Sequence, residues 1–273
     1  MSEKSISVAV AQLVGGPDVE SNLQAVEAMS VEAAQRGADI VVFPEATMFD
    51  FTATAERIAE AALLHALRFE DRVQAIAAAN SIAVVVGTYA VGTGTLARNM
   101  MLAFGPDGAP LGRYQKLHLY DAFHYKESEK NEPAPLQPDF GELVTFDHAG
   151  FRFGLLNCYD LRFPEMTRLL VDRGAEILLV ASGWVAGPLK EYHWETLLKA
   201  RAIESTAFVA ASCQPAPLSV GLSMIVDPNG IPIASVPEGT GLAIAQLDGT
   251  RIQAVRDVLP CLEHRRYVIR QDR

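Results

Sequence analysis

The sequence has 273 residues, of which 49% are hydrophobic and 21% charged, so it can bury a substantial core within a single domain. Its formal net charge of -10 at pH 7 repels nucleic-acid backbones and anionic membrane surfaces, so neither is expected as a partner. The start of the chain has only a short apolar run after charged residues, which predicts neither a signal peptide nor a membrane span. We therefore expect a cytoplasmic protein.

The first part of the chain predicts alternating strands and helices. Strands are expected over 5–13, 38–46 and 82–91, and helices over 19–36 and 55–79. The second strand is a continuous apolar run, as in a strand buried on both faces, and it stops at Pro44 and Glu45. A hairpin follows over 100–116, with its turn at 105–108, and Lys116 ends its second arm.

The middle of the chain predicts a loop and then a sharp elbow. Residues 118–141 contain three prolines and show no clear period, so we expect a long loop, and loops of this length are often functional. A second hairpin over 142–158 leads to Cys158, and Pro164 then lies near the start of a short helix. Cys158 is therefore expected at an elbow between a strand and a helix.

The remaining elements complete an α/β fold. Strands are expected over 176–182 and 207–212, a helix over 193–204 and a third hairpin over 222–236. Three hairpins among alternating elements predict mixed sheets, and about a dozen strands favour two sheets over one. We expect a core of two mixed sheets with helices outside. No linker divides the chain, so 1–273 is expected to be one domain.

The cysteine pattern indicates free thiols. Three cysteines, Cys158, Cys213 and Cys261, cannot all pair with one another, and their spacing is unlike that of a disulfide framework. The sequence contains no C-x-x-C, no H-E-x-x-H and no glycine-rich phosphate loop, so we predict neither a metal nor a cofactor.

Three ionisable residues, Glu45, Lys116 and Cys158, each end an apolar strand, and strand ends at one rim of an α/β core are where sites form. A free thiol has a pKa of ~8.5 and needs a base or a cation to become a nucleophile. Glu45 is the candidate base, and the Lys116 ammonium is suited to stabilise the oxyanion formed on a carbonyl or nitrile carbon. The backbone N–H of Tyr159 is a second candidate oxyanion donor.

Three sequence blocks carry a resemblance to a known family. The blocks "VVFPEA", "GRYQKLHLYD" and "NCYDLRFPE" resemble the catalytic blocks of the nitrilase, or carbon-nitrogen hydrolase, superfamily in the same order and at similar separations. The segment around His193 is also similar, so the resemblance covers nearly the whole chain. Within the superfamily the sequence is most similar to the amidase branch that includes omega-amidase and deaminated glutathione amidase.

This resemblance implies a four-layer α-β-β-α sandwich and a Glu45, Lys116 and Cys158 triad. The implied reaction is hydrolysis of a non-peptide C–N bond of a small linear amide through a cysteine thioester, without a cofactor. The family also implies a homodimer, and we expect residues from about 257 onward to lie at its interface.

The resemblance further points to a fourth catalytic residue, Glu127. The segment "KESEK" is similar to a Glu-Ser pair of the family in which the glutamate belongs to the active site. The preceding "AFHYK" departs from the glycine-containing segment usual there, which bears on Glu127 and on the shape of the pocket. His193 and Trp194 are expected to line the substrate pocket, although His193 can equally cap its helix.

Structural explanations compete with these assignments. Cys158 alone would be read as a packed thiol, and a glutamate or lysine at a strand end as half of a surface ion pair. A histidine base, from His118, His124 or His193, would leave Glu45 and Lys116 without a role. Arg162 and Glu165 lie a turn apart, and we expect them to brace the elbow.

Three alternative functions remain open. Nitrile hydrolysis and N-carbamoyl amide hydrolysis use the same triad, so the motif does not choose among the three substrate classes. A non-catalytic binding or regulatory homologue would keep the fold, but an intact triad argues against it.

Overall fold

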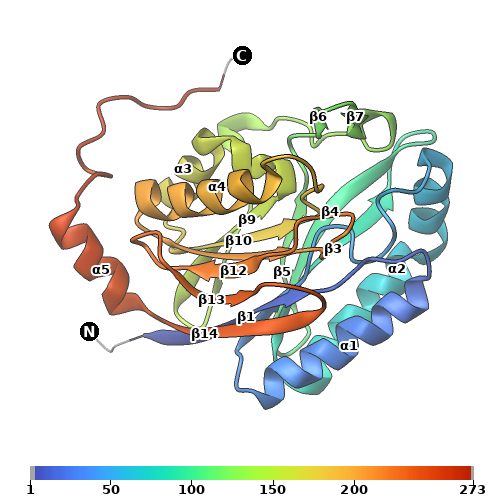
Figure 1. Cartoon of the computed structure of the whole chain (residues 1–273), viewed down its shortest axis with the longest axis horizontal. Helices are drawn as coiled ribbons and strands as arrows, with labels where there is room; N and C mark the ends of the chain where they lie inside the picture. Colours follow the sequence, from blue (N-terminus) through green and yellow to red (C-terminus); the bar gives the residue numbers. More distant parts are fainter. Residues whose placement is uncertain (1–3, 272–273) are drawn as a thin grey trace.

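The computed structural model describes residues 4–271 of the chain. Two six-stranded sheets pack face to face, with helices on the outer face of each, and Figure 1 shows these four layers. The expected α-β-β-α sandwich is confirmed.

The first sheet has the strand order β14-β1-β2-β3-β4-β5. Its strands are β1 (Ser5–Gln12), β2 (Ile40–Val42), β3 (Ala83–Val91), β4 (Ala97–Phe104), β5 (Pro110–Gln115) and β14 (Gly241–Asp248). β1, β2 and β3 run parallel, whereas β14, β4 and β5 pair antiparallel with their neighbours. The sheet is therefore mixed.

The second sheet has the strand order β13-β12-β11-β10-β9-β8. Its strands are β8 (Thr145–His148), β9 (Phe151–Asn157), β10 (Ile177–Ser182), β11 (Phe208–Cys213), β12 (Ser223–Val226) and β13 (Pro232–Val236). The three central strands, β9 to β11, run parallel, so their carboxyl ends share one edge. Both sheets thus combine a parallel centre with antiparallel margins.

Helices cover the two outer faces (Figure 1). α1 (Val19–Gln35) and α2 (Ala55–Asn80) cover the first sheet, and α3 (Pro164–Asp172) and α4 (Lys190–Ser205) cover the second. α5 (Gly249–Val258) follows β14. α1 begins where the Asp18 side chain accepts a hydrogen bond from the Ser21 N–H, at 2.7 Å.

Side chains alternate between the two faces of each strand, and this divides the apolar interior into separate layers. Val42 packs in the cluster between the two sheets, with Leu155 and Leu179, whereas its neighbour Val41 packs against the helices with Phe69. Successive strand residues point to opposite faces, so a strand covered on both sides is apolar throughout. This explains the unbroken apolar run before Glu45.

The structure corrects several sequence expectations. The predicted loop 118–141 contains a short hairpin, β6 (Asp121–Ala122) and β7 (Tyr125–Lys126), and two 3₁₀ turns, η1 (Glu127–Glu129) and η2 (Pro138–Phe140). The hairpin escapes prediction because its tip places Phe123 and His124, with φ of 54° and 66°, in the left-handed region that glycine usually occupies. α4 begins at Lys190, earlier than predicted, and β14 and α5 were not predicted. Among residues 4–271, no helix is long and apolar enough to span a membrane.

Candidate active site

Cys158 lies at the elbow that the sequence predicted. It follows β9 directly and begins a short 3₁₀ helix, η3 (Cys158–Arg162). Its φ is 51°, a left-handed backbone conformation that costs energy for a residue with a Cβ. Such strained turns between strand and helix present a nucleophile at the edge of a sheet in other hydrolases.

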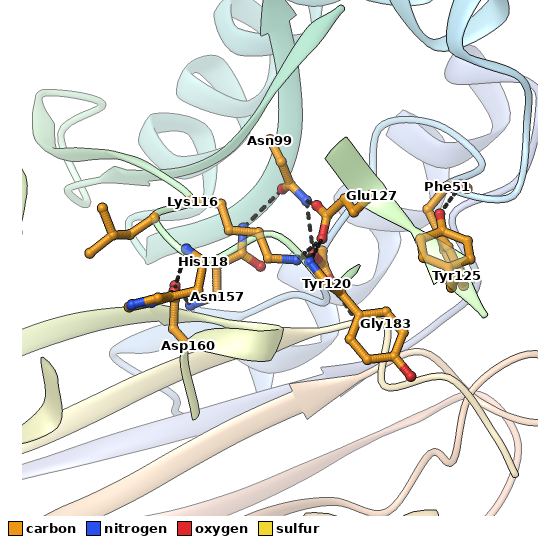
Figure 2. Close-up of polar contacts among 12 residues, drawn as sticks. Phe51, Asn99, Lys116, His118, Tyr120, Tyr125, Glu127, Asn157, Asp160 and Gly183 are labelled. Atoms are coloured by element: carbon orange, nitrogen blue, oxygen red, sulfur yellow. Dashed lines mark hydrogen bonds and ion pairs between the residues drawn. The ribbon is translucent and has the colours of Figure 1, made fainter. Parts of the chain in front are cut away.

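A buried carboxylate, Asp160, holds this elbow in place. Its oxygens accept hydrogen bonds from the Tyr114 hydroxyl at 2.6 Å, the Asn157 N–H at 3.0 Å and the His118 N–H at 3.1 Å. The His118 ring Nδ1 lies 2.8 Å from the same carboxylate. Asp160 therefore ties the elbow to the segment that follows β5, as Figure 2 shows for His118 and Asn157.

Glu45 is placed by a tight backbone contact between two parallel strands. It lies in the turn after β2, and a Cβ at Gly87 would approach the Pro44 carbonyl oxygen to 2.4 Å and Glu45 Cα to 2.6 Å. Only glycine leaves room for that approach. The Glu45 carbonyl oxygen also accepts a hydrogen bond from Gln214 Nε2 at 2.8 Å. The first sheet, through Gly87, and the residue that follows β11 of the second sheet, Gln214, thereby hold the turn from both sides.

Lys116 lies between two carboxylates, and Figure 2 shows it beside one of them, Glu127. Its Nζ is 2.7 Å from Glu45 Oε1 and 2.7 Å from Glu127 Oε2, and the side chain is almost fully buried. Asn99 Nδ2 donates to both glutamates, at 2.8 and 3.0 Å. The second oxygen of Glu45 accepts from the Gly183 N–H at 2.8 Å. The arrangement is a rigid cluster in which every charge has a partner.

Burial and pairing shift the pKa values in this cluster. Burial acts to raise the pKa of Glu45, but the Lys116 charge and several hydrogen bonds outweigh it and hold that pKa below its usual value. Burial and the Glu45 charge raise the pKa of Glu127 despite Lys116. Burial acts to lower the pKa of Lys116, yet the two carboxylates raise it well above its usual value. Glu45 and Lys116 are therefore ionised at neutral pH.

The Cys158 thiol is protonated in the resting site. Burial raises its pKa well above the usual value, and the charge of Glu45 adds to this effect while Lys116 opposes it. Such a thiol needs a base at the moment of attack, and Glu45 is the carboxylate placed to serve.

One cavity, here called the site cavity, brings most of the predicted residues together. Its lining comprises Glu45, Phe51, Tyr89, Asn99, Lys116, Tyr120, Tyr125, Glu127, Asn131, Cys158, Tyr159, Arg162, Gly183, Trp184, Val185 and Lys190. Five predicted site residues, Glu45, Lys116, Glu127, Cys158 and Tyr159, are among them. Most of the lining comes from strand ends and from the segment 118–131.

Two predicted pocket residues lie elsewhere. Trp194 is fully buried in the core, where its Nε1 donates to the Leu222 carbonyl oxygen at 2.9 Å. His193 neighbours Trp194 on α4 and does not line the site cavity. Because α4 begins earlier than predicted, its first residue, Lys190, reaches the cavity instead, together with Trp184.

Several polar residues of the cavity were not predicted from the sequence. Asn99 had a readable signal, since it interrupts an apolar strand, where a polar side chain must find partners. Arg162 was expected to brace the elbow, but it lines the cavity, and its Nε and Nη2 have no hydrogen-bond partner among residues 4–271. Its guanidinium lies 4.6 Å from the centroid of the Trp184 ring.

The other candidate groups, Cys213, Cys261 and His118, have the surroundings of structural residues. Cys213 is buried and Cys261 half-buried, and both are free, as predicted. The His118 ring is stacked on Phe163 at 3.7 Å between centroids and contacts Asp160, not the thiol. In the described range 4–271, no three His, Cys, Asp or Glu side chains are grouped so that they could hold a metal ion.

Comparisons with known proteins identify the family and its structural neighbours. The sequence pattern of a family described as carbon-nitrogen hydrolase matches residues 7–257. The chain is 35% identical to a deaminated glutathione amidase of Escherichia coli O157:H7 over 252 residues, which cover 91% of this chain and 92% of that protein. The solved NitFhit protein of C. elegans has a TM-score of 0.87 at 29% identity, over 97% of this chain and 66% of that one. A mutant amidase of Nesterenkonia sp. AN1 in complex with butyramide has a TM-score of 0.78 at 25% identity, over 94% and 96%.

Proposed function

The chain belongs to the carbon-nitrogen hydrolase family and cleaves amide C–N bonds. We propose that this cleavage passes through a cysteine thioester and that Glu45, Lys116, Cys158 and Glu127 carry it out. The observation that carries the proposal is the buried Lys116, held between two carboxylates in the cavity that Cys158 lines. Burying three charged side chains is costly, and a packed core has no need of them. The proposed substrates are small linear amides, which yield a carboxylate and ammonia.

In the first half of the reaction, Glu45 takes the proton from Cys158 Sγ as the sulfur attacks the amide carbon. The carbonyl oxygen becomes an oxyanion. Two of the three Lys116 N–H groups are used by Glu45 and Glu127, which leaves one for this oxyanion. The second donor is the N–H of Tyr159, in the first turn of η3, where N–H groups have no partner within the helix.

In the second half, the C–N bond breaks and Glu45 returns the proton to the leaving nitrogen, which departs as ammonia. The acyl group remains on Cys158 as a thioester. A water molecule then attacks the thioester carbon while Glu45 takes its proton. When the C–S bond breaks and the carboxylic acid leaves, Glu45 returns this proton to Sγ and the thiol is restored. Glu45 thus acts as base, acid, base and acid in turn.

In this account, Glu127 positions Lys116. One of its oxygens accepts from Lys116 and from the Tyr120 N–H at 2.8 Å, and the other accepts from Asn99. A cation held from two sides keeps its third donor in one direction, which is what stabilisation of a developing charge requires.

Ammonia release across matched compounds tests the function. We expect the wild-type protein to release ammonia from butyramide and from dicarboxylate half-amides, and Cys158→Ala, purified in parallel, to release none above background. Faster turnover of nitriles or of N-carbamoyl compounds than of amides would replace the proposed substrate class. No ammonia from any of the three classes would favour a non-catalytic homologue.

We also propose that the chain forms a homodimer. Arg265 pairs with Asp172 of α3, and residues 266–271 then extend away from the sandwich (Figure 1). Val258, Tyr267 and Val268 expose 82%, 93% and 77% of their surface. A second copy, related by a two-fold axis, would cover such apolar side chains together with Tyr192 of α4. Light scattering at micromolar concentration should give twice the chain mass of 29.5 kDa, and a value of 29.5 kDa would contradict the dimer.

Two further expectations remain proposals. We propose that 1–273 acts as one domain, because the family pattern reaches from 7 to 257. A cytoplasmic location is proposed from the charge of the chain and from its free thiols, Cys158, Cys213 and Cys261.

A further inference from the structure

Gln214, the residue directly after β11, reaches across to the turn that carries Glu45. Only 1% of its surface is exposed, and both ends of its side-chain amide are hydrogen-bonded. Nε2 donates to the Glu45 carbonyl oxygen at 2.8 Å, and Oε1 accepts from the Gly15 N–H at 3.2 Å. Gln214 does not line the site cavity, so it can affect the reaction only through another residue.

The turn that Gln214 holds has a strained backbone. Ala46, directly after Glu45, is fully buried and has a φ of 55°, a left-handed conformation that costs energy for a residue with a Cβ. A Cβ at Gly15 would approach the Ala46 carbonyl oxygen to 2.2 Å, so the segment after β1 packs directly on this turn. The Gln214 amide joins the two segments. A strained turn keeps its shape only while such surrounding contacts hold it.

Gln214 also reaches the carboxylate of Glu45, through one peptide unit. Its backbone N–H donates to the Ser182 carbonyl oxygen at 3.0 Å, and the Gly183 N–H donates to Glu45 Oε2 at 2.8 Å. That carbonyl and that N–H belong to the same peptide unit, so each hydrogen bond polarises the unit and strengthens the other. Gln214 therefore contacts the backbone of Glu45 directly and its carboxylate through a single peptide.

We propose that Gln214 is a positioning residue that fixes the direction of the Glu45 carboxylate toward Cys158 Sγ. The inference rests on the proposed function, since it requires Glu45 to be the base. Glu45 exchanges protons with the thiol, the leaving nitrogen and the attacking water, and each transfer requires the carboxylate within hydrogen-bond reach. A displacement of about 1 Å can cost about 10²-fold in rate, so a residue outside the cavity can control turnover.

A purely structural role for Gln214 makes a different prediction. If its only role were to join the two sheets, its loss would lower the free energy of unfolding and leave turnover by the folded protein unchanged. Gln12, at the end of β1, offers a matched control because it is also fully buried. Its amide donates to the Gly239 carbonyl oxygen at 2.8 Å and accepts from the Ser223 N–H at 2.9 Å, without a hydrogen bond to Glu45.

The test measures kcat for butyramide and the rate at which methyl methanethiosulfonate modifies the Cys158 thiol, followed by mass spectrometry. We expect Gln214→Met to lower both by about 10- to 100-fold, with KM changed by no more than about threefold. Gln12→Met should lower the thermal unfolding temperature by a similar amount but keep both rates near wild type. In a Glu45→Gln background, adding Gln214→Met should change the modification rate by less than about twofold, because Gln214 acts through Glu45.

A second variant, Gln214→Glu, keeps the test decisive if Gln214→Met does not fold. A protonated carboxyl group can still donate to the Glu45 carbonyl oxygen and accept from Gly15, whereas an ionised one repels that oxygen. The rate of Cys158 modification in Gln214→Glu, relative to wild type at the same pH, should therefore rise as the pH is lowered.

The same measurements separate failure of this inference from failure of the proposed function. If wild type releases no ammonia but Cys158 modification still depends on Gln214 through Glu45, the proposed function fails and the positioning role stands. Three results would overturn the inference. They are an equal loss in modification rate with and without the Glu45 carboxylate, wild-type rates in Gln214→Met, and a relative rate of Gln214→Glu that does not change with pH.

Discussion

Replacement of Cys158 by alanine is expected to abolish ammonia release while the protein stays folded. The loss in kcat should be at least about 10⁴-fold, because no other group in the cavity can form the thioester. The fold should persist because the change removes a single sulfur atom, and the left-handed backbone at this position costs alanine no more than cysteine. Steady-state ammonia assays and circular dichroism check the two halves of this prediction.

Cys261→Ala is the matched control for the loss of a thiol. Cys261 is half-buried, its Sγ faces the Glu204 carbonyl oxygen at 3.7 Å, and it does not line the site cavity. Its variant should retain wild-type kcat. If Cys158→Ala were to retain substantial turnover, the nucleophile would have to be another group.

The second large effect is expected from loss of charge at Glu127. Glu127→Gln keeps the shape of the side chain but removes one of the two charges that hold Lys116 at 2.7 Å. We expect kcat to fall by roughly 10² to 10⁴, the range for loss of an acid-base or positioning group. Because Glu45 remains in place, KM should change much less than kcat.

Glu129→Gln is the control for this prediction. Glu129 belongs to the same 3₁₀ turn, but its side chain is 69% exposed and its ion-pair partner is the equally exposed Lys126, at 3.4 Å. Exposed pairs of this kind contribute little, so the variant should resemble wild type. A larger effect at Glu129 than at Glu127, or full activity of both variants, would show that Glu45 works without a second carboxylate.

The sequence was most informative where one physical rule governed a whole segment. The unbroken apolar run before Glu45 predicted a strand covered on both faces, and the hairpin turns predicted mixed sheets. Strand ends also located Glu45, Lys116 and Cys158, because the carboxyl ends of parallel strands meet at one edge. These inferences depend only on local pattern.

The remaining features depend on contacts that local pattern does not encode. The β6–β7 hairpin needs left-handed backbone at Phe123 and His124, residues that rarely adopt it without tertiary support. The helix was expected to begin at residue 193, but α4 begins at Lys190, and Lys190 lines the cavity. Trp194 was placed at the pocket by resemblance, whereas packing against Trp184 and a bond to Leu222 keep it in the core.

The central claim is that the acyl group of the substrate passes through Cys158. Wild-type protein quenched in acid during turnover of butyramide, then digested and mapped by mass spectrometry, tests it most directly. We expect a butyryl adduct on the peptide that contains Cys158, and none on that peptide in Cys158→Ala. A butyryl adduct on Cys213 or Cys261, with Cys158 unmodified, would contradict it.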